Sequence, residues 1–260
     1  MKHIPRKRFG QHFLVDRSII SRIVGAIDAQ PTDSLVEIGP GLGALTVALL
    51  ERVHRLQVIE LDRDLAARLR ANYPPERVVV HEGDALRFDF SMLDAPLRVV
   101  GNLPFNISTP LLFHMAAYAE CFTDLHFMLQ REVVERMVAA PSTPEYGRLS
   151  VMLQYRFRMR NLISVPSSAF RPAPKVASAV VRLVPLLRPD VAAHDESLFG
   201  ETVTRAFSHR RKTLRNALLE LATEADLHAV GVDPGLRAEN LSVAEFVAIS
   251  NRVAKQAGEA

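Results

Sequence analysis

A glycine-rich loop between a short apolar run and a helical pattern limits the possible folds more than any other part of this sequence. Residues 35–38 read Leu-Val-Glu-Ile, which is typical of a short buried strand. Residues 39–43 read Gly-Pro-Gly-Leu-Gly, and from Ala44 to about Val53 the spacing is helical. Such a loop allows a tight turn and lets a ligand approach the backbone at the start of a helix. The sequence therefore predicts the first strand, loop and helix of a doubly wound α/β sheet.

The glycines alone do not decide which ligand this loop binds. Gly39, Gly41 and Ala44 also satisfy the pattern of dinucleotide-binding proteins, so the loop fits either NAD or S-adenosylmethionine. Glu37 helps to separate the two. A carboxylate is unfavourable beside a pyrophosphate, but favourable near the ammonium and sulfonium groups of S-adenosylmethionine. The acid therefore favours S-adenosylmethionine as the cofactor.

Three more polar residues lie at the ends of predicted strands. Glu60 follows Gly43 by 17 residues, close to the spacing of roughly 20 residues at which an acid binds ribose hydroxyls. Asp84 and Asn102 follow the next two apolar runs, and Asp84 can reach an adenine amine. Any one such residue is more often a solvated strand end. The carboxyl ends of the strands in an open α/β sheet line one crevice, however, so four such ends in succession predict a binding site.

The run Asn102-Leu103-Pro104-Phe105 suits the modification of an exocyclic amine of a nucleobase. Such a nitrogen is a poor nucleophile, because its lone pair is delocalised into the ring. The Asn102 side-chain oxygen and the Leu103 carbonyl can accept hydrogen bonds from the amine, while Pro104 stiffens the loop. The Phe105 ring can stack on a base taken out of its helix. An Asn-x-Pro-aromatic run is also ordinary turn chemistry, and the upstream strand ends favour the catalytic interpretation.

Basic residues are concentrated in three segments of the chain. Residues 1–17 carry a charge of +4, residues 146–189 carry +8 without an acid, and residues 202–219 carry +5 without an acid. The whole chain carries only +3, so the remainder carries −14. A chain polarised in this way presents a basic face to a polyanion. A solvated helix face or an anionic-lipid patch would show the same composition, and the run at residues 102–105 favours nucleic acid.

The composition fits a globular protein of a reducing compartment. The 260 residues are 48% hydrophobic and 23% charged, which are ordinary values. Cys121 is the only cysteine, so no disulfide can form within the chain. We find neither a signal peptide nor an apolar run of the ~18 residues needed to span a bilayer. No Cys or His spacing indicates a metal site. We therefore expect a cytoplasmic protein without membrane contact or bound metal, and a monomer.

The hydrophobic pattern changes in the last third of the chain. Residues 35–185 alternate between strand-type and helix-type spacing. Pro185 and Pro189 bracket a linker, after which only helical spacing is found. The sequence therefore predicts an α/β domain over residues 1–185 and a small all-helical subdomain over residues 190–260.

Longer motifs reveal a resemblance to a known family. The chain resembles the small-subunit ribosomal RNA adenine N6,N6-dimethyltransferase family along essentially its whole length. The residues that carry the resemblance are 8–14, 36–41, 59–62, 101–108, 146–150, 169–176 and 207–212. The resemblance implies a class I methyltransferase with a Rossmann-like doubly wound sheet that uses S-adenosyl-L-methionine. It also implies the substrate, which is two adjacent adenines near the 3′ end of 16S rRNA in the immature small ribosomal subunit.

The resemblance further assigns roles to individual residues. It implies that the methyl donor contacts His12, Leu14, Gly39, Glu60, Asp84 and Asn102. Two residues depart from the family pattern. His12 stands where the family commonly has Asn, and Phe105 stands where Tyr is frequent. With Phe105, base stacking is retained and the hydrogen bond of a phenol is lost.

Two further groups complete the predicted site. Phe170 lies in a proline-rich loop beside two cations, and its ring could sandwich the target adenine against Phe105; the alternative is a ring that plugs the edge of the domain. Arg210, Arg211 and Lys212 are adjacent cations without a nearby acid. We expect them to contact rRNA phosphates from the helical subdomain, and the alternatives are a solvated helix face or contacts between the domains.

The expected reaction is a direct in-line transfer of a methyl group to adenine N6, without a covalent enzyme intermediate. Two other interpretations remain open. One is a methyltransferase that acts on adenines of DNA or of another RNA, because enzymes of that chemistry share the Asn-x-Pro-aromatic run. The other is a binding module whose main role is to occupy the immature subunit.

Overall fold

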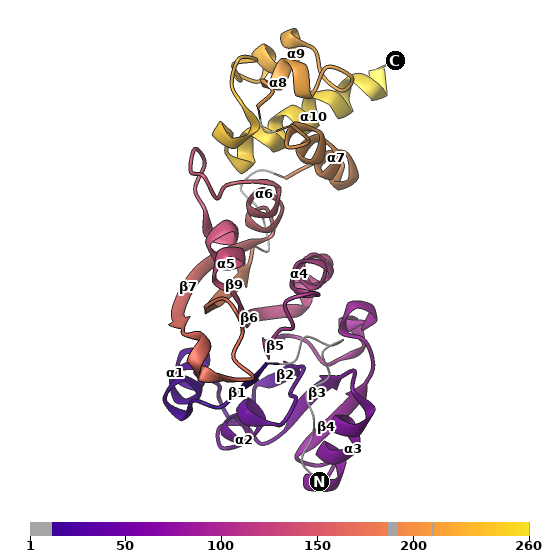
Figure 1. The fold of residues 1–260 in the computed structure, drawn as a ribbon. Coiled ribbons are helices and arrows are strands. Elements are labelled where there is room, and N and C mark those ends of the chain that lie inside the picture. The colour runs from indigo at the N-terminus through magenta and orange to yellow at the C-terminus, as the bar shows by residue number, and fades with distance from the viewer. Residues whose placement is uncertain (1–11, 187–191, 210, 260) are drawn as a thin grey trace. The chain divides into compact units, whose positions relative to one another are not determined.

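The computed structural model describes residues 12–186, 192–209 and 211–259 and divides the chain into two compact units (Figure 1). The first unit contains Met1–Val134 and Phe157–Pro185, and the second contains Glu135–Arg156 and Leu186–Ala260. The chain passes from the first unit to the second after Pro185, and Glu135–Arg156 groups with the second unit. This segment contributes buried residues such as Tyr146 to the second unit's core. Helical spacing alone does not reveal which core a helix joins. The domain bounds of 1–185 and 190–260 stay a prediction.

A seven-stranded sheet forms the centre of the first unit. Its strand order is β4-β3-β2-β5-β6-β9-β7. The strands are β2 (Ser34–Ile38), β3 (Leu56–Glu60), β4 (Val78–Glu82), β5 (Leu97–Asn102), β6 (Phe122–Gln130), β7 (Phe157–Val165) and β9 (Ser178–Pro185). Strands β2 to β6 run parallel, whereas β9 pairs antiparallel with both β6 and β7. The strand order reverses between β2 and β5, and ligands bind at the carboxyl ends of such a pair.

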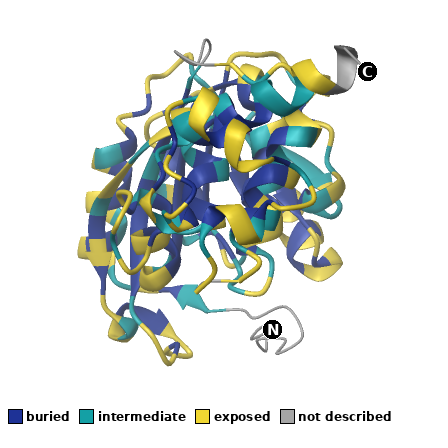
Figure 2. Ribbon diagram, turned by 90° about the horizontal axis from the view of Figure 1, so that it is seen from above, coloured by how far each residue is buried: buried dark blue, intermediate teal, exposed yellow. Residues whose placement is uncertain are grey.

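Helices cover this sheet. They are α1 (Arg17–Ile27), α2 (Ala44–Leu50), α3 (Arg63–Asn72) and α4 (Ser108–Ala117), and α5 (Arg131–Val138) spans the division between the units. Short 3-10 helices are η2 (Ala85–Arg87), η3 (Phe90–Met92), η4 (Ala119–Cys121) and η5 (Ser167–Ala169). Helix α1 begins at Asp16, whose side chain accepts hydrogen bonds from the Ser18 and Ile19 N–H groups. Figure 2 shows largely buried strands and helices that carry exposed residues along their outer faces.

Apolar side chains from three helices pack against one face of the sheet. Ile23 and Ile27 of α1, Leu49 of α2 and Leu69 of α3 join strand residues such as Val58 in one buried cluster. The spacing of the apolar residues along α1 explains this arrangement, because its buried positions recur every three or four residues. The cluster holds the strands in register and so fixes the positions of their carboxyl ends.

A small second sheet brings two distant segments of the chain together. Strand β1 (Phe13–Leu14) pairs antiparallel with β8 (Phe170–Arg171). The Ala169 carbonyl also accepts a hydrogen bond from the Val15 N–H at 2.9 Å. The pairing places the residues around β1 beside the proline-rich loop that follows β8.

The second unit is built from helices, and its described residues contain no strand. Its elements are α6 (Arg148–Gln154), α7 (Glu196–Ala206), α8 (Leu214–Ala217), α9 (Glu224–Ala229), η6 (Ala238–Asn240) and α10 (Val243–Glu259). Phe199, Leu214 and Phe246 lie in its core. The Tyr146 hydroxyl donates to the Leu241 carbonyl at 2.8 Å and so joins two distant parts of this unit.

The predicted fold class, a Rossmann-like doubly wound α/β sheet with further helices, is confirmed. Helix α2 begins at the expected Ala44 and ends at Leu50, before the predicted Val53. Of the described helices, none is both long and apolar enough to cross a bilayer.

Candidate active site

A pocket opens at the carboxyl ends of the central parallel strands. Its walls come from the glycine loop, the ends of β3, β4 and β5, and the segment around β1. The lining residues are 12–14, 37–42, 44, 45, 59–62, 83–85, 102–107 and Phe170. All six residues expected to contact the methyl donor, the run 102–105 and Phe170 therefore line one pocket; their roles toward a ligand stay predictions.

Backbone conformation fixes the glycine loop. Gly39, Gly41 and Gly43 have φ angles of 65°, 58° and 87°, in the left-handed region that favours glycine. A Cβ atom at Gly41 would also lie 3.2 Å from the Phe13 ring. At Gly101, before Asn102, a Cβ atom would lie 2.7 Å from the Ile38 carbonyl oxygen, which no side chain can tolerate. The glycines therefore allow β2, β5 and β1 to approach one another around the pocket.

Glu60 connects the end of β3 to the glycine loop. Its carboxylate oxygens accept hydrogen bonds from the N–H groups of Gly41 at 3.1 Å and Asp62 at 2.9 Å. Burial raises the pKa of Glu60, which is only 6% exposed, and the backbone hydrogen bonds oppose the rise. Each carboxylate oxygen has two lone pairs, so Glu60 can still accept a hydrogen bond from a ligand hydroxyl.

Glu37 is a second buried acid in the pocket wall. It is 2% exposed, and the Thr46 hydroxyl donates to its Oε2 at 2.7 Å. Burial raises the pKa of Glu37 to about 7; the Thr46 hydrogen bond opposes the rise and the charge of Glu60 adds to it. The described lining residues include no Lys or Arg. A pocket with buried acids and no described cation disfavours a pyrophosphate and suits a positively charged ligand.

Asp84 lies at the start of η2, after β4. Its Oδ1 accepts a hydrogen bond from the Leu86 N–H at 3.0 Å, which holds the half-buried side chain at the pocket wall. Asp62 does the same for α3, because its Oδ1 accepts from the Asp64 N–H at 3.0 Å. The two acids therefore define the local turns as well as lining the pocket.

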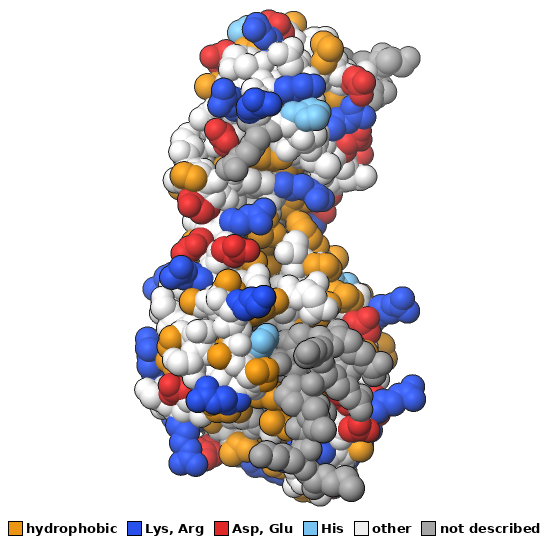
Figure 3. All heavy atoms as spheres, viewed as in Figure 1, with side chains coloured by type: hydrophobic (Ala, Val, Ile, Leu, Met, Phe, Trp, Pro, Cys, Tyr) orange, Lys and Arg blue, Asp and Glu red, His pale blue; other side chains and the backbone are white. Residues whose placement is uncertain are grey.

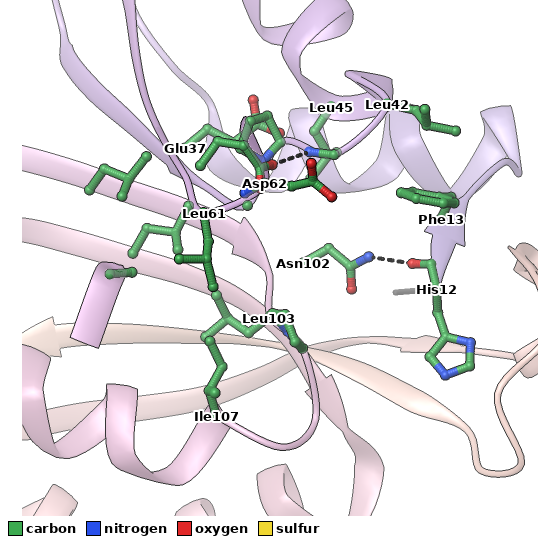
Figure 4. Close-up of a pocket in the computed structure, with 18 of the residues that line it drawn as sticks. His12, Phe13, Glu37, Leu42, Leu45, Leu61, Asp62, Asn102, Leu103 and Ile107 are labelled. Atoms are coloured by element: carbon green, nitrogen blue, oxygen red, sulfur yellow. Dashed lines mark hydrogen bonds between the residues drawn. The ribbon is translucent and has the colours of Figure 1, made fainter. Parts of the chain in front are cut away.

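The Asn102 amide is held in one orientation at the end of β5. Its Nδ2 donates to the main-chain carbonyl of His12 at 2.9 Å (Figure 4). A carbonyl oxygen can only accept, so the nitrogen must face His12. The Oδ1 atom is then the end of the amide that is available to a ligand. This is the acceptor that the sequence analysis requires for an exocyclic amine.

The loop after Asn102 is fixed by its own hydrogen bonds. The Leu103 N–H donates to the Met128 carbonyl at 3.1 Å, and the Pro104 carbonyl accepts from the Ser108 hydroxyl at 3.0 Å. Phe105 is half-buried, and its ring centroid lies 5.6 Å from that of His12, with 31° between the ring planes. The two residues that depart from the family pattern are therefore in ring contact with each other.

Phe170 contributes to the pocket wall from within the hydrophobic core. Its side chain is 1% exposed and packs in the same buried cluster as Leu14. The ring is not presented to solvent for stacking in this structure. The sandwich of an adenine between Phe105 and Phe170 stays a prediction, and the burial agrees with the alternative of a ring that fills the domain edge.

The basic segments of the second unit are partly paired. Arg205 forms ion pairs with Glu201 and Glu220, both at 2.8 Å. Arg211 and Lys212 are exposed, and no ion pair joins either to another described residue; Arg210 lies outside the described residues. An open hollow of this unit is lined by Ser142, Thr143, Pro144, Arg211, Arg237 and Glu239. Lys and Arg side chains are spread over the face shown in Figure 3. The described residues contain no cluster of three potential metal ligands.

The doubly wound sheet, with a glycine loop and acids at its carboxyl edge, defines a class I methyltransferase. A family model described as ribosomal RNA adenine dimethylase matches residues 2–255. The chain belongs to this family and is a ribosomal RNA adenine dimethyltransferase.

Individual proteins show the same relationship. The chain is 60% identical over 259 residues to the ribosomal RNA small subunit methyltransferase A of Aromatoleum aromaticum, which covers 100% of this chain and 98% of that protein. It is 59% identical over 253 residues to the protein of the same name from Chromobacterium violaceum, with 97% of each covered.

Solved structures share the fold. A dimethyladenosine transferase from Plasmodium falciparum is similar with a TM-score of 0.79 and 24% identity, covering 92% of this chain and 96% of that one. The 23S rRNA methyltransferase ErmE is similar with a TM-score of 0.71 and 26% identity, covering 93% and 99%.

Sequence reasoning missed three residues that shape the pocket. Phe13 packs against Gly41, the Thr46 hydroxyl binds Glu37, and the Pro172 carbonyl lies 2.8 Å from Nδ1 of His12. Thr46 could have been found, because a hydroxyl in the first turn of the helix after the glycine loop lies near the preceding strand. The other two contacts depend on the pairing of β1 with β8, for which residues 13–14 carry no periodicity.

Proposed function

We propose that this protein transfers methyl groups from S-adenosylmethionine to N6 of two adjacent adenines near the 3′ end of 16S rRNA in immature small ribosomal subunits. The observation that carries the proposal is the fixed Asn102 amide, whose free Oδ1 belongs to a pocket of buried acids. The relatives' name, ribosomal RNA small subunit methyltransferase A, supports this choice of subunit. The protein would act in the cytoplasm, where the subunit is assembled, and as a monomer.

The residues present fit S-adenosylmethionine. The glycine loop exposes its backbone to the pocket, with Gly41 in the left-handed region at φ 58°, and the lining combines acids with apolar side chains such as Leu61. Glu60 would accept hydrogen bonds from ribose hydroxyls, Asp84 from the adenine amine, and Glu37 would attract the cationic groups. The bound cofactor supplies an electrophilic methyl carbon.

The chain's own contribution to the reaction is to prepare the amine. Oδ1 of Asn102 and the Leu103 carbonyl accept hydrogen bonds from the two N6 hydrogens, which localises the nitrogen lone pair. Phe105 would stack on the extruded base and hold its amine at attack distance. Transfer would form the new N–C bond and break the bond between the donor's sulfur and the methyl carbon, which leaves a neutral thioether. One N6 proton, made acidic by the new bond, would be lost to water. A second round requires the monomethylated amine to bind again.

Docking of the large substrate is assigned to the second unit. Arg211 and Lys212 are exposed and, among the described residues, free of ion pairs, so they can bind RNA phosphates. We assign the same role to Arg210 on the basis of the sequence, because it is adjacent to these two cations. Two arginines, Arg211 and Arg237, line the same hollow, which supports a phosphate contact there.

The proposal is tested by replacing Asn102 with alanine. We expect turnover to fall by about 10²-fold or more, because a preorganised acceptor is lost, and donor affinity to fall at most moderately. The measurements are methyl incorporation into immature small subunits and location of dimethyladenosine in rRNA from cells with and without the protein. Near-normal turnover of Asn102→Ala would reject the assigned role.

The same variant separates the rival interpretations. Naked rRNA and duplex DNA serve as alternative substrates in the incorporation assay, and faster methylation of either would displace the immature subunit as the substrate. Full complementation of a deletion strain by the inactive Asn102→Ala protein would favour a binding module over an enzyme as the main role.

A further inference from the structure

His12 makes three contacts that join it to the catalytic loop and to the loop after β8. Its Nδ1 lies 2.8 Å from the Pro172 carbonyl, and because that oxygen can only accept, Nδ1 is the donor. Its own carbonyl accepts the Asn102 amide at 2.9 Å. Its ring meets the Phe105 ring at 5.6 Å.

These contacts connect the β1–β8 pairing to the catalytic loop. The backbone after His12 is held by the pairing of Leu14 with Phe170. The His12 side chain is held separately, by the hydrogen bond from its Nδ1 to the Pro172 carbonyl. The position of the His12 carbonyl therefore depends on both anchors, and the orientation of the Asn102 amide depends on that carbonyl. Figure 4 shows Asn102 directed toward the His12 main chain, while the imidazole extends away from this hydrogen bond.

We propose that His12 is a positioning residue for the target adenine, which its side chain serves through Phe105 and Asn102, and that this side chain does not bind the methyl donor. The inference rests on the proposed function and refines it. It also differs from the role that the family resemblance implies, because the Nδ1 atom is engaged by Pro172 and the ring is in contact with Phe105.

The first test is His12→Ala in the full-length protein. Loss of the tether and of the ring contact should misplace the base and its acceptor, so kcat on immature subunits should fall about tenfold. The KM for subunits should stay within about threefold, because phosphate contacts elsewhere dominate RNA binding. The dissociation constant of S-adenosylhomocysteine, measured by calorimetry, should stay within about twofold.

The second test is a double-mutant cycle with Phe105→Ala. Because part of the effect of His12 passes through Phe105, the double variant should be faster than the product of the two single effects, and the remaining loss would pass through Asn102. Two fully independent effects would multiply, and that result would overturn the role. His54→Ala is the matched control, since this exposed histidine lies on the same unit away from the pocket lining.

Other outcomes decide against the proposal in different ways. A loss of donor affinity of tenfold or more, with kcat unchanged at saturating donor, would assign His12 to the cofactor. Unchanged kinetics would show that the contacts have no role in the reaction. A wild-type protein that fails to methylate immature subunits in the same assay would reject the proposed substrate, irrespective of His12. Thermal unfolding of each variant checks that the fold is retained.

Discussion

The two ends of the central sheet hold buried carboxylates in opposite environments. At the carboxyl ends of β2 and β3, Glu37 and Glu60 lie in a pocket whose described lining includes no cation, and burial raises the pKa of both. Toward the other end, Asp124 of β6 is 1% exposed and bonded to two arginines. The arginines therefore offset the free-energy cost of burying Asp124. No described cation offsets the cost of burying Glu37 and Glu60.

The Asp124 cluster satisfies its charges within the chain. Nε of Arg98 lies 2.9 Å from one carboxylate oxygen and Nη2 of Arg182 lies 2.8 Å from the other, while Arg98 also pairs with Asp33 at 2.7 Å. Burial alone would raise the pKa of Asp124, but the hydrogen bonds and charges of the arginines outweigh it and lower the pKa. Burial keeps the neighbouring His126 neutral by lowering its pKa to about 4.

The contrast separates structure from function. Removing one partner of a buried ion pair destabilises a fold strongly, whereas a buried acid without a described cation keeps a cost of burial that a cationic ligand would offset. The raised pKa of the two pocket acids agrees with the proposal that they bind the cofactor.

The largest effect on stability should come from removing the negative charge of Asp124. Asp124→Asn leaves Arg98 and Arg182 without a buried negative charge, and we expect about 3–5 kcal/mol of destabilisation at neutral pH. Because the folded pKa of Asp124 is lowered, this stability is present above its unfolded pKa of 3.8 and is lost as the pH falls through the folded value. Urea unfolding across pH checks both points. Equal stability of wild type and Asp124→Asn at pH 7 would show that the ion pairs of Asp124 do not stabilise the fold.

At the pocket end, Glu60→Ala should change binding more than stability. We expect the free energy of S-adenosylmethionine binding to weaken by roughly 2–3 kcal/mol, the range for charge-assisted hydrogen bonds. Titration calorimetry measures the change, with Asp124→Asn as the comparison at a temperature where that protein is folded. Unchanged affinity in Glu60→Ala would remove Glu60 from the binding site.

Glu37→Gln should stabilise the fold above neutral pH, whereas Asp124→Asn should destabilise it. The folded pKa of Glu37, about 7, lies above its ordinary value of 4.5, so wild-type stability declines as the pH rises from 4.5 to about 7. Glutamine cannot ionise, and we expect the variant to be about 3 kcal/mol more stable than wild type at pH 8 and equal to it below pH 4.5. Donor affinity should fall in the same protein. A variant less stable than wild type at pH 8 would contradict the comparison.

The smallest effect concerns Arg211 and Lys212, which are exposed and belong neither to the Asp124 cluster nor to the pocket. Neutralising Arg211 and Lys212 together with Arg210 should flatten the salt dependence of subunit binding by about 0.7–0.9 log unit per lost phosphate contact. Donor affinity should not change. Neutralising Arg205, which is paired with acids, is the control. An unchanged salt slope would indicate a solvated surface, and a lower melting temperature with normal RNA binding would indicate a structural role.

Local patterns were sufficient for the parallel strands β2 to β5 and for the residues at their ends. The strand ends that carry Gly39, Glu60, Asp84 and Asn102 could be placed from the sequence, because parallel strands bring their carboxyl ends to one edge. Motif resemblance added His12 and Leu14 to the same pocket. The burial of Phe170 could not be read from its proline-rich loop, since a two-residue strand has no periodicity of its own.

Charge was the least predictable property. Residues 146–189 and 202–219 contain no acid, yet Arg182 is paired with Asp124 and Arg205 with Glu220. The partners come from other segments, and only the fold brings them within hydrogen-bonding distance.

The sequence by itself determined the parallel strands β2 to β5, the glycine loop and the types of residue at the strand ends, because those follow from short-range periodicity and backbone sterics. The tertiary structure decided which buried acids are paired, which end of the Asn102 amide faces a ligand, and what His12 contacts. Each of these depends on atoms far apart in the chain, such as the Asn102 amide and the His12 carbonyl 90 positions before it. Hydrogen bonds act over about 3 Å, so their partners are set only when distant segments are packed together.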